Sequence, residues 1–295
     1  MTTDPIINLI TALWLGGLGA CIGSFLNVVA YRLPLGMSVV WKPSHCPKCG
    51  HAIRARDNVP VFGWLWLRGK CRDCGEGISA RYAIVEALMG LAFFVLAYFE
   101  LFGGGGNLPQ GPISEFVGAM DNVWVPYWPL IGLYAYHGLL LSLLMSVTLI
   151  DLDGQRVPSK LFSLGLIAGV GLAGWYPILQ PALSVNGMSI SLSGVVGAGV
   201  GWLVGVATVR LLSMFSSQHL ANSGRNLIVG FVLLGAFLGW QGVAAMTGVA
   251  FVAGVGAIFQ KDKGRWLAAE LFVPAALVQL AFWKPLAEAI RSITS

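Results

Sequence analysis

The stretch Trp128–Ile150 reads WPLIGLYAYHGLLLSLLMSVTLI and contains no Asp, Glu, Lys or Arg. A helix of about 20 apolar residues, rising 1.5 Å each, crosses the hydrocarbon core of a bilayer. The stretch is therefore long enough to span a membrane, and Asp151 follows it directly. Because lipid offers no hydrogen-bond partner to the backbone, we expect this segment to be a helix.

The rest of the chain repeats this pattern. Of its 295 residues, 56% are hydrophobic and 11% are charged, whereas a soluble domain carries about 25% charged residues. So few charges cannot cover a globular surface, which indicates that lipid surrounds most of the chain. The apolar runs are Ile6–Tyr31, Ala83–Phe102, Trp128–Ile150, Leu161–Leu179, Ile190–Leu212, Leu227–Trp240, Val243–Phe259 and Trp266–Phe282.

These runs predict an all-α, polytopic transmembrane bundle of about eight spans, with seven as the alternative. The sixth and seventh runs are short and separated only at Gln241-Gly242, so they form either a tight hairpin or one long helix. The first run has no basic segment before it, and Arg32 follows it, so we do not expect a cleaved signal peptide.

Positive charge is concentrated in one loop. The segment Arg32–Arg81 carries nine of the 18 Lys and Arg residues, whereas Gly103–Pro126 carries none. By the positive-inside rule the basic loop is cytoplasmic, which places both termini outside. The basic pI of about 9.0 reflects this distribution and does not indicate nucleic-acid binding. Contact between the same loop and anionic lipid is compatible with this orientation.

The basic loop contains two CxxC pairs, Cys46–Cys49 and Cys71–Cys74. Two such pairs present four thiolates to one ion, the set that structural zinc prefers. Disulfides are the alternative but are disfavoured in a reducing cytoplasm, and thiolates also suit iron. Lys48, Lys70 and Arg72 are expected to favour the thiolate form. Cys21, inside the first run, is interpreted as a packing residue.

Two domains follow from this organisation. Residues 1–82 are the first span plus the four-cysteine loop, and residues 83–295 are a transmembrane bundle. A loop of about 50 residues is expected to gain most of its fold from the metal.

Carboxylates at the ends of spans are candidate functional groups because burying them is costly. Asp151 is the strongest candidate, whereas Asp153 is interpreted as a solvated loop residue. Glu86 and Glu270 are each five residues after an arginine, with which they could pair. His137 is 14 residues before Asp151, about 21 Å along a helix, and is interpreted as a satisfied interior histidine.

Several segments of residues 20–90 together resemble bacterial prepilin leader peptidase/N-methyltransferases. They are Gly23–Pro34 (GSFLNVVAYRLP), Ser44–His51 (SHCPKCGH), Asn58–Pro60 (NVP), Trp64–Leu65, Leu67–Arg72 (LRGKCR), Ile78–Tyr82 (ISARY) and Val85–Glu86.

The resemblance implies a multi-pass inner-membrane protein that cuts the basic leader from type IV prepilins or type II secretion pseudopilins at the cytoplasmic face. It also implies methylation of the new N-terminus with S-adenosylmethionine. Arg68, Lys70 and Glu86 are candidate contributors to a methyl-transfer site by resemblance, and equally can be ordinary loop residues.

The resemblance further implies two catalytic aspartates. Asp151, seven residues before Pro158, is similar to the first, although Ser159 follows where the family usually has Asp. The second stands in a Gly-x-Gly-Asp motif before a helix resembling Leu234–Gln241 (LGAFLGWQ), but this chain has Ala221–Asn226 (ANSGRN) there. No Asp or Glu occurs from Gly154 to Lys261, and the nearest positional counterpart is Asn226, after a shift of one residue.

Three hypotheses follow. The chain is a membrane aspartyl endopeptidase with Asp151 and an unrecognised partner, for which Asp153, Asp262 and Glu270 are candidates. Alternatively, it is a protease-inactive homologue that retains N-methyltransferase activity, or a non-enzymatic prepilin-binding component of pilus or type II secretion assembly.

Overall fold

The structure, a computed structural model, describes residues 4–41, 43–109, 112–114, 118–180, 190–215, 220–258, 272–286 and 288. Every element in these ranges is a helix, as predicted, apart from two isolated β-bridges. The elements are α1 (Pro5–Arg32), η1 (Ala55–Asp57), α2 (Phe62–Trp66), α3 (Arg81–Leu96), η2 (Ala97–Leu101), α4 (Ala119–Trp124), α5 (Trp128–Leu152), α6 (Ser159–Leu166), η3 (Ile167–Leu172), α7 (Ala173–Trp175), η4 (Pro177–Leu179), α8 (Ile190–Phe215), α9 (Leu220–Ile258) and α10 (Phe272–Ala281).

Four helical segments in the described ranges are long and apolar enough to cross a membrane: Pro5–Arg32, Arg81–Leu101, Trp128–Leu152 and Gly194–Leu211. Three shorter apolar segments, Ser159–Trp175, Gly224–Trp240 and Phe272–Ala281, accompany them. All the predicted runs contain helix, but the count of eight spans stays a prediction. The first six residues of the last run, 266–271, lie outside the described residues.

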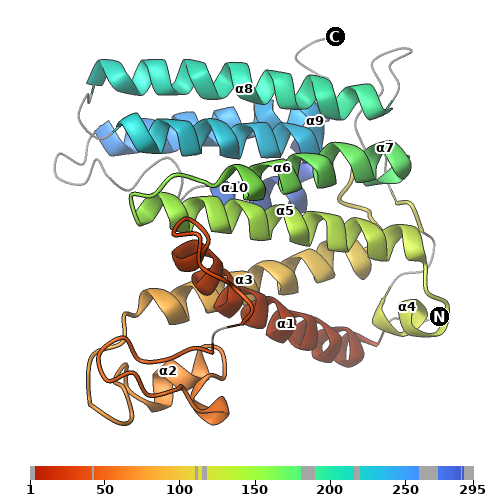
Figure 1. Cartoon of the computed structure of the whole chain (residues 1–295). Helices are drawn as coiled ribbons and strands as arrows, with labels where there is room; N and C mark the ends of the chain where they lie inside the picture. The colour runs from red at the N-terminus through yellow and green to blue at the C-terminus, as the bar shows by residue number, and fades with distance from the viewer. Residues whose placement is uncertain are drawn as a thin grey trace.

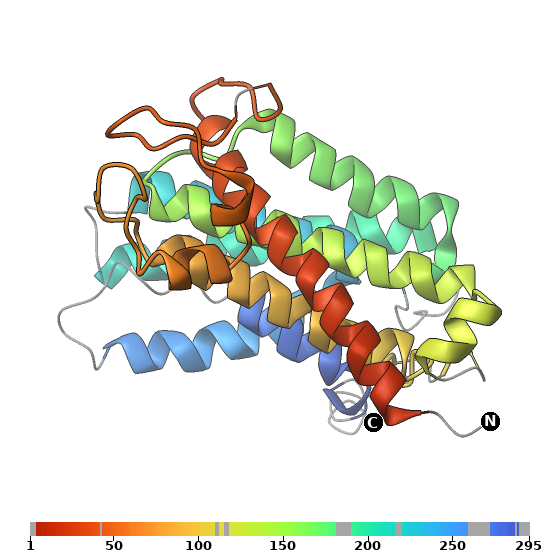
Figure 2. The ribbon, with the colours of Figure 1, turned by 90° about the horizontal axis from the view of Figure 1, so that it is seen from below.

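Helix α5 forms the centre of the bundle. In its most apolar window 72% of the residues are buried, against 22% in α1 and in α8. Figure 1 shows α8 and α9 on one side of α5 and α3 and α1 on the other. In Figure 2, α1 crosses the other helices obliquely, and the loop that follows it lies at one end of the bundle. The outer helices therefore face lipid, while α5 contributes most of its surface to the interior.

Helix α9 covers the sixth and seventh predicted runs and consists of two helical segments that meet at a kink. The bend is at Gly239, where φ is 71° and ψ is −176°, a conformation open to glycine and rarely to other residues. The sequence placed this break at Gln241-Gly242, two residues later.

Helices α8 and α9 approach closely through glycine. A Cβ atom at Gly197 would collide with the carbonyl oxygen of Gly235, and one at Gly201 with the carbonyl oxygen of Phe231. Such contacts are the usual way in which membrane helices gain van der Waals packing without a hydrophobic driving force.

Gly197→Ala is expected to destabilise the bundle by about 1–3 kcal/mol, because the added methyl group pushes α8 away from α9. The matched control is Gly199→Ala on the same helix, where a Cβ atom would meet nothing within 4 Å. Thermal unfolding in detergent measures both variants. Equal melting temperatures for the two would contradict the close contact.

Candidate functional site

Asp151 lies in the last turn of α5 and is partly buried. The chain then turns at Gly154, where φ is 67°, and reaches Pro158 just before α6. Asn226 lies near the start of α9 and has 0% of its surface exposed. The fold brings these two residues into direct contact.

Three hydrogen bonds hold the Asn226 side chain. Its Nδ2 donates to Oδ1 of Asp151 (2.9 Å) and to the carbonyl oxygen of Gln155 (2.8 Å), and its Oδ1 accepts from the backbone N–H of Val157 (3.0 Å). Both amide hydrogens are therefore committed. The site joins a carboxylate to an amide rather than to a second carboxylate.

Asp153 is an exposed carboxylate at the end of α5, as interpreted, and it also has a partner. It forms an ion pair with Arg81 at the start of α3, whose Nη2 also donates to the carbonyl oxygen of Leu149 (3.1 Å). The possible Glu86–Arg81 pair does not form, since Arg81 pairs with Asp153 and Glu86 Oε2 accepts from the backbone N–H of Val61 (2.7 Å).

The other two candidate carboxylates, Asp262 and Glu270, lie outside the described residues. Asn226 is a described residue whose side chain contacts the Asp151 carboxylate.

An apolar cavity of about 300 Å³ lies beside this pair. Two of its lining residues are next to Asn226: the N–H of Val157 donates to Asn226, and Arg225 precedes Asn226 in the chain. The rest of its lining comes from Ser159 and Phe162 on α6, Trp202 on α8, and Ile228, Val229 and Val232 on α9. The cavity can therefore accept an apolar segment beside Val157, whose N–H donates to Asn226.

The four-cysteine loop forms the predicted cluster. The sulfur atoms of Cys46, Cys49, Cys71 and Cys74 all lie within 4.8 Å of one another, and those of Cys46 and Cys74 are 3.8 Å apart. Zinc with four bonds of 2.3 Å places its sulfurs about 3.8 Å apart. The four thiols therefore fit a tetrahedral zinc or iron ion, which they would hold as a structural centre.

The two CxxC knuckles repeat one backbone pattern. The N–H of Gly50 donates to the carbonyl oxygen of Cys46 (2.9 Å), and the N–H of Gly75 donates to that of Cys71 (3.0 Å). Both glycines have φ above 70°, so each turn uses a conformation that favours glycine.

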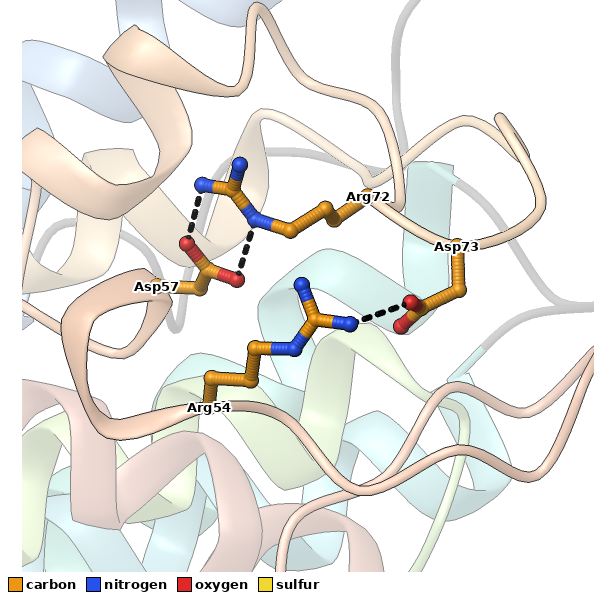
Figure 3. Close-up of polar contacts among 4 residues, drawn as sticks. All are labelled: Arg54, Asp57, Arg72 and Asp73. Atoms are coloured by element: carbon orange, nitrogen blue, oxygen red, sulfur yellow. Dashed lines mark hydrogen bonds and ion pairs between the residues drawn. The ribbon is translucent and has the colours of Figure 1, made fainter.

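Ion pairs connect the two halves of the loop (Figure 3). Arg72 donates to both carboxylate oxygens of Asp57, at 2.8 and 2.5 Å, and Arg54 pairs with Asp73 at 2.7 Å. The hydrogen bond from Arg72 lowers the pKa of Asp57. Lys48 pairs with Glu76 at 3.3 Å.

Lys48 and Arg72 were expected to favour the cysteine thiolates, but both side chains pair with carboxylates instead. The pKa of the Cys46 thiol falls to about 7, first because the backbone N–H groups of Cys49 and Lys48 donate to its sulfur. Backbone geometry, rather than the Lys48 or Arg72 side chain, therefore favours this thiolate. Cys21 is exposed on α1, so its interpretation as a packing residue was wrong.

Replacing Cys49 or Cys74 with Ser is expected to abolish stoichiometric metal binding and to unfold the loop, because ligand binding supplies much of its folding free energy. Metal content per chain and tryptic cleavage after Arg54, Arg56 and Arg68 measure these effects. Cys21→Ser is the matched control and is expected to change neither. Retention of one ion per chain by the Cys74→Ser variant would contradict the four-cysteine centre.

His137 is an interior histidine, as interpreted, and its partner Glu100 is a residue that the sequence patterns did not single out. Glu100 on η2 and His137 on α5 are both 0% exposed, with Nδ1 of the histidine 2.5 Å from Oε1 of the glutamate. Within the described part of the chain, Oε2 of Glu100 and Nε2 of His137 have no hydrogen-bond partner. The sequence does contain a signal for this pair. Glu100 is a charged residue within the apolar run Ala83–Phe102, and such residues are usually functional or paired.

Fold and site together define a polytopic membrane protein with a four-cysteine loop and a carboxylate at the end of a central span. Residues 18–100 match the family model of the bacterial peptidase A24 N-terminal domain. No solved structure matches the chain.

Curated relatives extend the match beyond this segment. A prepilin leader peptidase/N-methyltransferase of Myxococcus xanthus is 35% identical over 247 residues, which cover 82% of this chain and 59% of the relative. One of Pectobacterium carotovorum is 31% identical and covers 84% of this chain and 83% of the relative. A type 4 prepilin-like proteins leader peptide-processing enzyme of Escherichia coli is 31% identical, with 80% and 78% covered. The chain belongs to the prepilin leader peptidase/N-methyltransferase family.

Proposed function

We propose that this chain processes type IV prepilin-like precursors at the cytoplasmic face of the bacterial inner membrane. In this proposal it cleaves their leader peptides, and Asp151 is the catalytic carboxylate. The observation that carries the proposal is the position of Asp151 at the end of a central span, where Asn226 of α9 donates to its carboxylate. The names of the relatives support the choice of substrate.

Asp151 would act as the general base that activates water for attack on the leader peptide bond. Asn226 donates to one of its oxygens and so orients the carboxylate. Because both amide hydrogens of Asn226 are already donated to Asp151 and Gln155, neither is left for the substrate carbonyl. In this arrangement Asn226 cannot supply the shared proton of an aspartyl dyad, so we expect slow cleavage.

This same feature favours a second candidate function. With an amide in place of the second acid, the chain would be a protease-inactive homologue that methylates prepilins or binds them during pilus or type II secretion assembly. S-adenosylmethionine would then be the methyl donor. Glu86 contributes little to such a site, because it is buried and its carboxylate accepts from Val61, whereas Arg68 and Lys70 are exposed.

We further propose that residues 1–82 form a unit organised by zinc and that residues 83–295 carry the cleavage site. Arg81, which pairs with Asp153, connects the two. The metal would hold the loop against the end of α5 without taking part in hydrolysis, since it is bound by four thiolates and has no open position.

Cleavage of a synthetic prepilin in liposomes tests the proposal. We expect slow cleavage by the wild type and none by Asp151→Asn, with metal content as the control for folding. Asp121→Asn, which alters a carboxylate on α4, is the matched control. If a folded, metal-loaded wild type captures prepilin without cutting it, the peptidase proposal is wrong and the second candidate stands.

A further inference from the structure

Helix α2 exposes an apolar face. Phe62, Leu65 and Trp66 are 59%, 53% and 54% exposed, and at spacings of three and four residues they share one side of the helix. The rings of Phe62 and Trp66 are stacked, with centroids 6.2 Å apart. Three large apolar side chains that are exposed together on a polar loop indicate a surface that binds a protein or a membrane.

The opposite face of α2 is fixed to the loop. A Cβ atom at Gly63 would collide with the carbonyl oxygen of Asp57, so the backbone is closely packed there. The indole N–H of Trp64 donates to the carbonyl oxygen of Ile78 (2.9 Å), and its ring lies against Gly69. The outer face is therefore held in place rather than exposed by local mobility.

A hydrogen bond sets the position of α2 along the bundle. Val61, the residue before α2, donates its N–H to Glu86, which lies five residues, or about 7.5 Å, along α3 from its first residue. Near this level α3 exposes Ile84 (56%) and Leu88 (42%) on an apolar span. Figure 1 shows α2 on the flank of the bundle beside the start of α3. Helix α2 therefore lies near the depth at which a span passes from headgroups into hydrocarbon.

The charges that follow α2 fit a lipid surface. Arg68 and Lys70 are exposed and come two and four residues after the end of the helix. Aromatic rings concentrate at the interface between headgroups and hydrocarbon, and Lys or Arg next to them bind anionic headgroups.

We propose that α2 is an interfacial anchor that rests in the bilayer leaflet beside α1 and α3. Phe62, Leu65 and Trp66 enter the acyl boundary, and Arg68 and Lys70 contact anionic headgroups. The anchor fixes the four-cysteine loop at the membrane surface from the side, while the ion pair of Arg81 with Asp153 fixes it to the end of α5. It is independent of whether the chain cleaves, methylates or binds prepilins.

Photo-crosslinking in lipid nanodiscs tests this anchor on the full chain. The photoreactive residue p-benzoylphenylalanine replaces Phe62 or Trp66 in separate variants, in discs of phosphatidylcholine and phosphatidylglycerol. Leu91, which is 55% exposed on α3, is the lipid-facing control site, and Pro47, exposed in the first CxxC knuckle, is the water-facing control site. Metal content verifies that each variant has folded.

We expect lipid adducts at positions 62 and 66 that approach those at position 91 and exceed those at position 47 severalfold. Adducts no more frequent than at position 47 would overturn the anchor. Crosslinks between two copies of the chain, or to an added prepilin peptide in place of lipid, would assign the face to those partners and overturn it as well.

Discussion

Changing Asn226 to Asp is expected to raise the rate of prepilin cleavage by about two to four orders of magnitude, the usual contribution of a positioned acid or base. In the variant, one carboxylate oxygen would keep the hydrogen bond from Val157. The other would replace Nδ2, which stands 2.9 Å from Oδ1 of Asp151. Two carboxylate oxygens this close share one proton, which gives the division into acid and base that amide hydrolysis uses.

The gain in rate is expected to come with a loss of stability. Nδ2 of Asn226 now donates to both Asp151 and the carbonyl oxygen of Gln155, whereas a protonated carboxyl group has one hydrogen to donate. The carbonyl oxygen of Gln155 would lose this donor, at a cost of about 1–3 kcal/mol. Thermal unfolding should therefore show Asn226→Asp below the wild type, even as its cleavage rate rises.

The exchanged double variant, Asp151→Asn with Asn226→Asp, is the matched control. It keeps one carboxylate and one amide in contact, so its cleavage rate should stay at or below that of the wild type. If Asn226→Asp folds, binds prepilin and cleaves no faster than the wild type, then Asn226 is not the counterpart of the second catalytic acid.

The sequence was sufficient for the features that depend on local pattern. Apolar runs of about 20 residues predicted the spans, and the CxxC spacing predicted the cluster of Cys46, Cys49, Cys71 and Cys74, which the structure brings within 4.8 Å. The alignment of Asn226 with a missing acid predicted a position, and the structure places that side chain against Asp151.

The sequence could not predict which residues far apart in the chain form hydrogen bonds or ion pairs with one another. Arg81 has Glu86 nearby in sequence, but the turn after α5 brings Asp153 to it. Glu86 is then satisfied by the backbone of Val61, 25 residues earlier. Both partners are determined by how the loop packs against α3 and α5, and spacing along one helix carries no information about that packing.

His137→Phe is expected to destabilise the protein by about 1–3 kcal/mol, because it leaves the Glu100 carboxyl group buried without its hydrogen-bond partner. Both side chains are 0% exposed, and the bond between them is 2.5 Å long. The ring of Trp283 lies with its centroid 6.1 Å from that of His137, so an aromatic ring packs near the pair. The unfolding midpoint in detergent measures the loss.

The double variant Glu100→Leu with His137→Phe separates an unpaired polar group from a packing defect. Replacing both partners of a buried hydrogen bond with apolar groups of similar shape can be nearly neutral or stabilising, so the double variant should recover most of the stability that His137→Phe loses. Ser142→Ala, which removes a hydroxyl group bonded within α5, is the control for a polar change on the same helix and should cost little. If the double variant is as unstable as the single one, the phenyl ring introduced at position 137 is itself the cause, and the Glu100–His137 pair does not account for the effect.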